Sequence, residues 1–252
     1  MKKFICNKYI LYTLGIILFF IIWWMISLIV NKPVSVFPDP IRTIKESFTV
    51  LQTTYFYKSL GMSLLKMLIG FIIALLIALL LGIPAGYNEN IHKVLSPTMT
   101  ILKTIPTAAL VLLFLVLIGA KNAPIIIVVL ISFPILYESI VGGIRNVDKE
   151  VKEAASIETQ NILQNIFLVR LPLAMPTILV GISSSFALSF KIEIMAEIVS
   201  GDTSYGLGTA IALKQTQNAS NMVPVFAYAF LAIVLMLIVT ALGSLVKKLL
   251  TK

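Results

Sequence analysis

Four polar residues recur at intervals of four within one long apolar stretch: Ser185, Ser189, Glu193 and Glu197. An α-helix turns about 100° per residue, so each of these side chains lies about 40° round from the one before it. They therefore form a single slanted stripe on one helix. Polar and ionisable side chains in segments that cross a membrane often mark the path of a solute. We expect this stripe, and Ser185 and Ser189 above all, to line such a path.

Other ionisable side chains also lie inside apolar stretches, where an unpaired charge costs about 2.5–3.5 kcal/mol. At a rise of about 1.5 Å per residue, Lys66 and Glu193 lie at similar depths below one end of their helices. Lys103 and Glu138 likewise match near the other end. The sequence therefore predicts two pairs between helices, Lys66 with Glu193 and Lys103 with Glu138. Two alternatives stay open: that these side chains extend to the nearest headgroups, and that Glu197 simply faces the outer interface.

Residues and motifs for catalysis are missing from the sequence. The single histidine, His92, falls in a polar loop, which excludes a histidine-based metal site or catalytic triad. No G-x-x-x-x-G-K-[ST], G-x-S-x-G or H-E-x-x-H sequence occurs. Cys6 is the only cysteine, so no disulfide framework is possible. We therefore expect no enzyme activity, metal or cofactor in this chain.

The elements that must hold the polar residues are long apolar helices. Of the 252 residues, 59% are hydrophobic and 12% are charged, whereas soluble domains carry about 25% charged residues. Crossing a bilayer core takes about 20 residues of helix. Six stretches are long enough, at residues 9–30, 60–81, 97–119, 123–144, 172–199 and 223–246. The predicted fold is an all-α membrane protein with about six transmembrane helices in a single domain, residues 1–252.

Lysine and arginine residues predict the orientation of the chain. Eleven of them lie in loops and ends on the side that carries both termini, and six lie on the other side. Because cytoplasmic loops are the richer in these residues, both termini are expected to be cytoplasmic. This bias explains the net charge of +9, and no clustered basic surface indicates binding of nucleic acid.

The loop at residues 146–171 is the most polar insertion between two apolar stretches. A polar loop of this kind cannot lie in lipid and must face water. Its apolar residues, among them Val151, Ala154, Ile157, Ile162 and Ile166, recur at helical spacing. The loop is therefore predicted to form two short amphipathic helices that offer an apolar face to something outside the bilayer.

Three shorter patterns predict local structure. Asp39 followed by Pro40 is typical of a helix start, and the apolar residues that follow indicate an amphipathic helix at the outer interface. Gly82-x-x-x-Gly86 permits two helix backbones to approach closely. Pro106 is expected to break the third span, because proline lacks the amide donor of a helix.

Taken together, these patterns resemble the inner-membrane permease subunits of binding-protein-dependent ABC importers, and most of all their nitrate/sulfonate/taurine branch. The matching residues lie between Phe37 and Thr209, about two-thirds of the chain. They comprise Phe37-Pro38-Asp39-Pro40, Ser63-x-x-Lys66-x-x-x-Gly70-Phe71 with lysine where arginine is usual, Gly82-Ile83-Pro84-Ala85-Gly86, Ile105-Pro106-x-x-Ala109-Leu110, Gly119, Glu153-Ala154-Ala155 with Leu171-Pro172 downstream, Ala196-Glu197 and Gly206-Leu207-Gly208. The Glu153-Ala154-Ala155 string with its downstream Pro172 is the family's loop signature.

The resemblance implies that this loop forms coupling helices seated in a cleft of a separate ATPase subunit, which would bind ATP and Mg²⁺. Glu153 would contact that subunit, while Ala154 and Ala155 would keep the docking face small. Thr159 stands where the family usually has glycine, a residue that readily forms a left-handed turn. Thr159 is able instead to cap the second short helix through its hydroxyl.

The resemblance further implies a type I importer fold and a permease dimer in the bacterial cytoplasmic membrane, of two identical or two different chains. Two ATPase subunits would bind inside and a solute-binding protein outside, with membrane lipid around the dimer. Closure of the ATPase pair would push the loop, and the dimer would alternate between inward-open and outward-open states. The expected solute is a small anion or small organic molecule, such as nitrate, a sulfonate, taurine or a thiamine precursor.

Two other classes of function stay open. A secondary transporter or channel that works without ATP would predict two repeated halves and charges at mid-membrane. No clear repeat is visible, and the charges lie toward the helix ends. A membrane-embedded enzyme would need the nucleophile or metal motifs that are missing. Transport by the purified chain without any ATPase would favour the first alternative.

Overall fold

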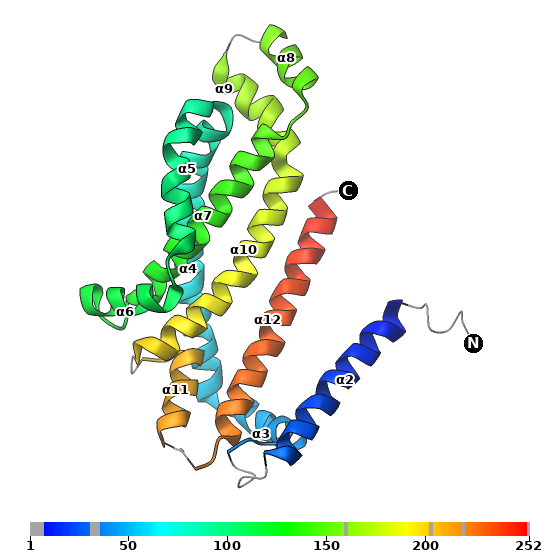
Figure 1. Ribbon diagram of the computed structural model, residues 1–252, viewed down its shortest axis with the longest axis vertical. Helices are drawn as coiled ribbons and strands as arrows, with labels where there is room; N and C mark the ends of the chain where they lie inside the picture. Colours follow the sequence, from blue (N-terminus) through cyan, green and yellow to red (C-terminus); the bar gives the residue numbers. More distant parts are fainter. Residues whose placement is uncertain (1–7, 31–35, 159–160, 202–203, 218–219, 251–252) are drawn as a thin grey trace. The chain divides into compact units, whose positions relative to one another are not determined.

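The computed structural model describes residues 8–30, 36–158, 161–201, 204–217 and 220–250. Within these ranges the chain is helical almost throughout and has no strand. The helices are α2 (Lys8–Ile29), α3 (Pro40–Leu51), α4 (Thr54–Tyr87), α5 (Glu89–Thr104), α6 (Thr107–Ile118), α7 (Ala123–Arg145), α8 (Lys149–Glu158), α9 (Ile162–Gln164), the π-helix η1 (Asn165–Arg170), α10 (Leu171–Ser200), α11 (Leu207–Gln217) and α12 (Val223–Leu250) (Figure 1). The predicted all-α class is confirmed.

Among the described residues, five helical segments are long and apolar enough to cross a membrane. They are Ile10–Ile29, Thr54–Tyr87, Ala123–Arg145, Ile162–Ser200 and Val223–Ala241. The pair α5 and α6 supplies a sixth span if it is counted as one, although the two helices meet at 93°. Pro106 stands at this break, and Ile105 before it is extended. Because proline disfavours the helical conformation in the preceding residue, the predicted interruption at Pro106 is confirmed.

The helices group into two compact units, and the first contains residues 1–57 and 210–233. Its short helix α3 begins as predicted, with Asp39 accepting a hydrogen bond from the backbone N–H of Arg42 at 2.9 Å and with Pro40 at the first helical position. Thr43 and Ser47 are buried, whereas Ile41 and Phe48 are 59% and 63% exposed. The apolar side of α3 therefore faces outward, as expected for a helix that lies against lipid.

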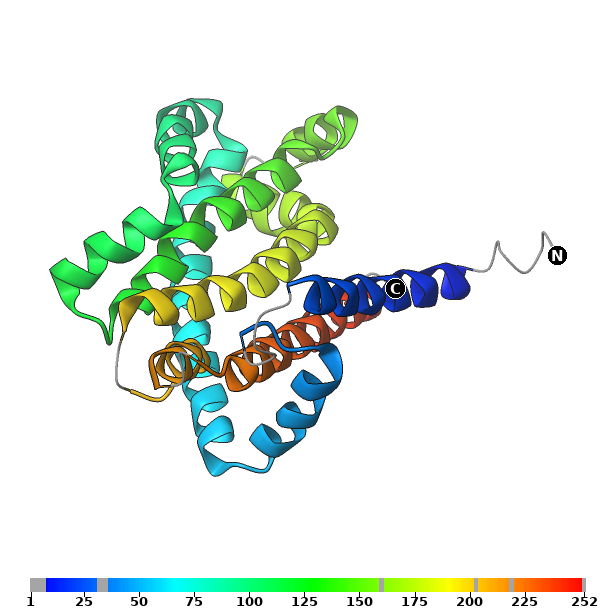
Figure 2. The same cartoon turned by 60° about the horizontal axis from the view of Figure 1, so that its bottom comes forward.

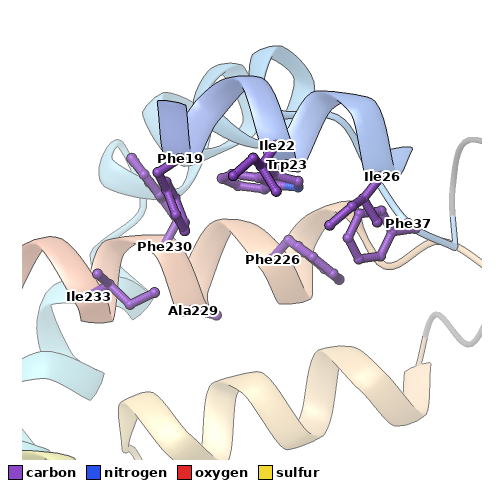
Figure 3. A pocket seen from close by; sticks show the side chains of 9 residues that line it. All are labelled: Phe19, Ile22, Trp23, Ile26, Phe37, Phe226, Ala229, Phe230 and Ile233. Carbon is purple, nitrogen blue, oxygen red and sulfur yellow. The ribbon is translucent and has the colours of Figure 1, made fainter. Parts of the chain in front are cut away.

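Aromatic side chains join α2 to the first turns of α12 within this unit. The indole N–H of Trp23 donates to the carbonyl of Pro38 at 3.2 Å, and its ring lies 6.4 Å from Phe226 and 6.5 Å from Phe230. Figure 3 shows these rings facing one another across a pocket of about 400 Å³, with Phe37 at one end. Its lining is apolar except for the Trp23 indole N–H, so the pocket suits hydrocarbon rather than a polar solute.

The second unit contains residues 58–209 and 234–252. Helices α7 and α10 run side by side through it in both Figure 1 and Figure 2. α4 packs against α7 where Gly82 and Gly86 face isoleucines. A Cβ added to Gly82 would lie 3.1 Å from Ile140, and one added to Gly86 would lie 2.9 Å from Ile144. The close approach predicted from Gly82-x-x-x-Gly86 is confirmed.

Gly181 of α10 lies against Ser139 of α7 with no room for a side chain. A Cβ at this position would overlap both the Cβ and the Oγ of Ser139. We expect Gly181→Ala to force the two helices apart and to lower the free energy of unfolding by about 1–3 kcal/mol, measured by denaturant unfolding in detergent. The matched control is Gly142→Ala on α7, where nothing lies within 4 Å of the added Cβ. Equal losses in both variants would contradict this packing.

The polar loop closes one end of the second unit. α8 and α9 lie where α7 ends, and both views place α6 at the opposite end of α7 (Figure 1, Figure 2). The first predicted short helix is α8. The second is not a separate helix, because α9, η1 and α10 form one continuous segment from Ile162 to Ser200.

Candidate functional site

Glu197 is the centre of a buried polar cluster in the second unit. Its carboxylate accepts hydrogen bonds from the Ser63 hydroxyl at 2.7 Å, the Gly208 N–H at 3.0 Å and the Lys66 ammonium at 3.3 Å. The Ser63 hydroxyl oxygen in turn accepts from the N–H of Leu207 at 2.8 Å. Glu197 and Ser63 are fully buried, and Lys66 is 4% exposed. The cluster therefore ties α4 and α10 to the start of α11 by charged and neutral hydrogen bonds.

Glycine residues allow the backbone before α11 to reach this carboxylate. A Cβ at Gly206 would overlap the carboxylate of Glu197, and one at Gly208 would lie 2.7 Å from the Glu197 Cβ. These glycines belong to the Gly206-Leu207-Gly208 string of the sequence. That string, together with Ser63-x-x-Lys66, was the signal that could have found the cluster. Sequence reasoning named both strings but assigned no contact to Ser63, Gly206 or Gly208.

The predicted pair of Lys66 with Glu193 is corrected by this geometry. Lys66 forms its ion pair with Glu197, one helical turn farther along α10. Both oxygens of Glu193 are buried and have no hydrogen-bond partner among the described residues. The prediction compared depths counted from expected helix ends, and α4 begins at Thr54 rather than near residue 60. A shift of about six residues corresponds to roughly 9 Å along the helix. The two glutamates are only one turn apart, about 5.4 Å, so the shift is large enough to exchange one for the other.

The serines of the predicted stripe lie inside the unit. Ser185 and Ser189 are fully buried, and the hydroxyl of Ser189 donates to the carbonyl of Ser185 at 2.7 Å. The hydroxyls of Ser189 and Ser132 are 2.7 Å apart, which links α10 to α7. Glu193 and Glu197 are buried on the same side of α10. None of the four presents an accessible surface in this conformation, and their role in lining a pathway stays a prediction.

Lys103 of α5 and Glu138 of α7 form the second predicted pair. Their charged atoms are 2.5 Å apart, so the predicted contact is confirmed. Their side chains are 40% and 49% exposed, unlike those of Lys66 and Glu197. Exposed pairs of this kind contribute only about 0–1 kcal/mol.

The predicted coupling residues divide between the two sides of α8. Ala155 is 4% exposed and packs into the unit, whereas Glu153 and Ala154 are exposed. Ile157 is 84% exposed, an unusual position for a large apolar side chain in a polar helix. Pro172 is exposed in the first turn of α10. Thr159, the candidate cap of the second short helix, lies outside the described residues.

Ser63 offers a direct test of the cluster around Glu197. We expect Ser63→Ala to lower the free energy of unfolding by about 1–3 kcal/mol, because it removes a donor to Glu197 and the acceptor of the Leu207 N–H. Thermal unfolding in detergent measures the change. Ser59→Ala is the matched control, since Ser59 is buried one turn earlier on α4 and its hydroxyl has no partner in the described part of the chain. A loss in Ser59→Ala as large as that in Ser63→Ala would contradict this interpretation.

Residues 74–252 match the family model described as the inner membrane component of binding-protein-dependent transport systems. The chain belongs to this family. The matched region contains the loop signature, the polar stripe of α10 and the glycines around Glu197, and it begins after Ser63 and Lys66.

Curated relatives of the permease come from the branch expected from its motifs. It is 26% identical over 209 residues to the putative aliphatic sulfonates transport permease protein SsuC of Bacillus subtilis, covering 82% of this chain and 76% of the relative. It is 23% identical to the nitrate import permease protein NrtB of Synechocystis, covering 73% and 69%. It is 22% identical to the taurine transport system permease protein TauC of Escherichia coli, covering 94% and 86%. The predicted family and branch are confirmed.

Solved structures confirm the fold of the permease. An inward-facing MetNI methionine ABC transporter matches with a TM-score of 0.63 and 18% identity, over 78% of this chain and 94% of the other. An amino acid ABC transporter matches with a TM-score of 0.63 and 21% identity, over 83% and 98%. The fold is therefore that of type I ABC importer permeases, and the chain is a multi-pass membrane protein of a family whose members are transport subunits rather than enzymes.

Proposed function

We propose that this chain is the membrane-spanning subunit of an ATP-driven importer and receives the work of a separate ATPase through α8. The observation that carries the proposal is the outer face of α8, which exposes Glu153, Ala154 and Ile157 within a matched permease sequence. A large apolar side chain beside small ones and one carboxylate is suited to a protein cleft, because the apolar area gains from burial and the charge sets the register. Ala155 fixes the other side of α8 to the permease itself.

The proposal includes an orientation in which α8 is cytoplasmic. Eleven lysines and arginines outside the spans then lie on the cytoplasmic side, with both termini, and six lie outside. It also includes a dimer, of identical or different chains, with two ATPase subunits inside and a solute-binding protein outside. Closure of the ATPase pair would move the two α8 helices together and shift the dimer from an inward-open to an outward-open state.

The names of the relatives support a small anion or small organic solute. SsuC is named for aliphatic sulfonates, NrtB for nitrate and TauC for taurine, while a 28% identical relative of Chloroflexus aurantiacus is named for riboflavin. We therefore propose nitrate, a sulfonate or taurine as the first candidates, with thiamine precursors as the second group. Because the relatives are named for chemically different solutes, we propose that a separate solute-binding protein selects the solute.

An accessible polar surface lies beside the buried stripe of α10. A hollow of about 430 Å³ is lined by Ser139, Thr177 and Ser184 together with Pro176, Val180 and Gly181. We place the solute path along this hollow, with Ser185 and Ser189 supporting it from behind. In a Cys6→Ser background, a charged thiol reagent should label Ser184→Cys much faster than Ser185→Cys. Equal labelling rates of the two cysteines would contradict the proposal that the solute passes along this hollow.

Reconstitution tests the proposed function as a whole. The chain is purified from its native membrane with its partners and placed in proteoliposomes, and uptake of radiolabelled sulfonate, taurine or nitrate is followed with and without enclosed ATP. We expect uptake to need ATP, the ATPase and the solute-binding protein. The recovered binding protein is screened in parallel for the solute that raises its Tm. Uptake by the chain alone, without ATP, would establish a secondary transporter or channel instead.

A further inference from the structure

A groove on the surface of the second unit lies between α4 and the segment that begins with α9. Its volume is about 590 Å³, and leucine and isoleucine side chains of both segments form its walls. Leu76 and Leu80 of α4 are 61% and 73% exposed, and Leu163 and Phe167 opposite them are 64% and 52% exposed. Tyr87 and Asn88, where α4 ends, add polar groups to its lining, and Ile91 of α5 follows them. The groove is therefore open and mostly apolar, with polar groups where α4 ends.

The groove reaches well into the membrane-spanning part of α4. Leu76 precedes Tyr87 by eleven residues, which corresponds to roughly 16 Å along the helix. The residues between them are apolar apart from two glycines, Gly82 and Gly86. A soluble protein cannot follow the groove to this depth, because hydrocarbon surrounds the helix there. A lipid acyl chain, in contrast, occupies the hydrocarbon region and is able to enter the groove at the depth of Leu76.

One cation, Arg170, lies next to the groove residue Tyr87, and two more cations lie near Arg170. The Arg170 guanidinium lies 4.5 Å from the centre of the Tyr87 ring, and its Nε donates to Asn165 at 2.9 Å. The Lys152 ammonium donates to the carbonyl of Arg145 at 2.6 Å. Burial lowers the pKa of Lys152, and the positive charges of Arg170 and Arg145 lower it further, against the opposite effect of Asp148. Lys152 therefore lies close enough to both Arg170 and Arg145 to be repelled by them.

No carboxylate neutralises this group by direct contact. In the ranges that the structure describes, none of Arg145, Lys152 and Arg170 has an aspartate or glutamate within ion-pair distance. Glu89, next to the groove residue Asn88, forms its ion pair with Lys93 at 3.0 Å, and the more distant charge of Arg145 also lowers the pKa of Glu89. An anion that approaches Arg170 from the groove would relieve the repulsion among the cations. Basic pockets between transmembrane helices at a membrane surface bind lipid headgroups in this way.

We propose that this groove binds an anionic phospholipid, with an acyl chain along Leu76, Leu80 and Phe167 and the phosphate at Arg170. Tyr87 lies at the level of the headgroup, where tyrosine commonly lies at a membrane interface. The lipid would join α4 to the segment that follows α8, so it would hold the base of α8 in place from the membrane side. The proposed orientation of the chain only decides which leaflet supplies the lipid.

Native mass spectrometry of the delipidated full chain in detergent tests the site. The chain is titrated with phosphatidylglycerol and, separately, with phosphatidylcholine carrying the same acyl chains. We expect tighter binding of phosphatidylglycerol, and we expect Arg170→Gln to weaken that binding about fivefold, the equivalent of about 1 kcal/mol per basic residue. Arg170→Gln should leave the weaker binding of phosphatidylcholine nearly unchanged. Phe167→Glu should weaken both lipids, because it places a charge in the acyl-chain channel.

Two matched variants and one soluble probe complete the test. Lys93→Gln removes an exposed cation outside the groove, and Leu168→Glu adds a charge to the neighbouring residue of η1, which does not line the groove. Both should bind phosphatidylglycerol like the parent chain, and glycerol 3-phosphate should not displace the lipid.

Equal affinity for the two lipids, or equal effects of Arg170→Gln and Lys93→Gln, would overturn the proposal. Displacement of the lipid by the ATPase subunit, with Phe167→Glu weakening only the capture of that subunit, would assign the groove to the protein partner. None of these measurements needs ATP or transport, so their failure is distinct from failure of the proposed function.

Discussion

Replacing Lys66 with methionine is expected to lower the free energy of unfolding of the permease by about 3–5 kcal/mol. Methionine keeps the length and the apolar stem of lysine but removes the cation that lies 3.3 Å from Glu197. The carboxylate of Glu197 is fully buried and would keep only the Ser63 hydroxyl and the Gly208 N–H among the donors described above. A buried charge that loses its counter-charge carries its desolvation cost uncompensated. Denaturant unfolding in detergent measures the loss.

A double variant separates the ion pair from the size of the side chains. Lys66→Met combined with Glu197→Gln removes both charges and keeps an acceptor for Ser63, so it should be more stable than Lys66→Met alone. Lys103→Met is the matched control on the half-exposed pair with Glu138 and should cost less than about 1 kcal/mol. If Lys66→Met and Lys103→Met cost the same, or if the double variant loses the sum of the two single changes, the charges of Lys66 and Glu197 are not coupled.

The parts of the fold that sequence predicted correctly are those set by neighbouring residues. α3 starts at Asp39-Pro40 because the Asp39 side chain caps the helix and the Pro40 ring favours the helical backbone at its first position. The break before α6 follows because Pro106 disfavours the helical conformation of Ile105. Apolar runs of about 20 residues were enough to place the candidate spans. The contact at Gly82 and Gly86 was predictable because small residues four apart form one smooth strip on a helix, whichever helix covers it.

The details of the site depended on how helices are turned and shifted against one another. The stripe of α10 was visible in the sequence, but its burial against Ser132 and Ser63 depends on the rotation of α10 within the unit. The choice of Glu197 over Glu193 depends on a shift of one turn, smaller than the uncertainty of helix ends in a sequence. Local periodicity carries no information on either quantity. Contact between Lys103 and Glu138 was predicted because both residues lie near the same ends of adjacent segments, where a small shift still leaves long side chains in reach.

The outward face of α8 carries the second large prediction, which concerns partner binding rather than stability. Glu153→Arg is expected to reduce capture of the ATPase subunit and ATP-dependent uptake by more than about tenfold. The Glu153 side chain is 64% exposed and its ion pair with Lys149 is also exposed, so reversing its charge should leave the free energy of unfolding nearly unchanged. Reversal of a charge that sets the register in an interface costs about 2 kcal/mol or more, which corresponds to that loss of affinity. Ile157→Arg should act in the same direction, because it replaces the exposed apolar contact.

Glu158→Arg is the matched control, since it makes the same charge change on the same helix, five residues from Glu153 and about 140° round from it. It should retain capture and uptake, which would show that the position on α8, rather than the net charge of the loop, decides docking. Co-purification with the tagged ATPase subunit and uptake into proteoliposomes measure the two effects separately. If Glu153→Arg keeps both at the level of Glu158→Arg, or if a membrane-impermeant reagent reaches α8 from the outside of intact cells, α8 does not receive the ATPase. Ala155 is buried on one side of α8, while Glu153 and Ile157 are exposed on another side. Because α8 contacts η1, which continues into α10, a force applied to the exposed side would pass through η1 to α10.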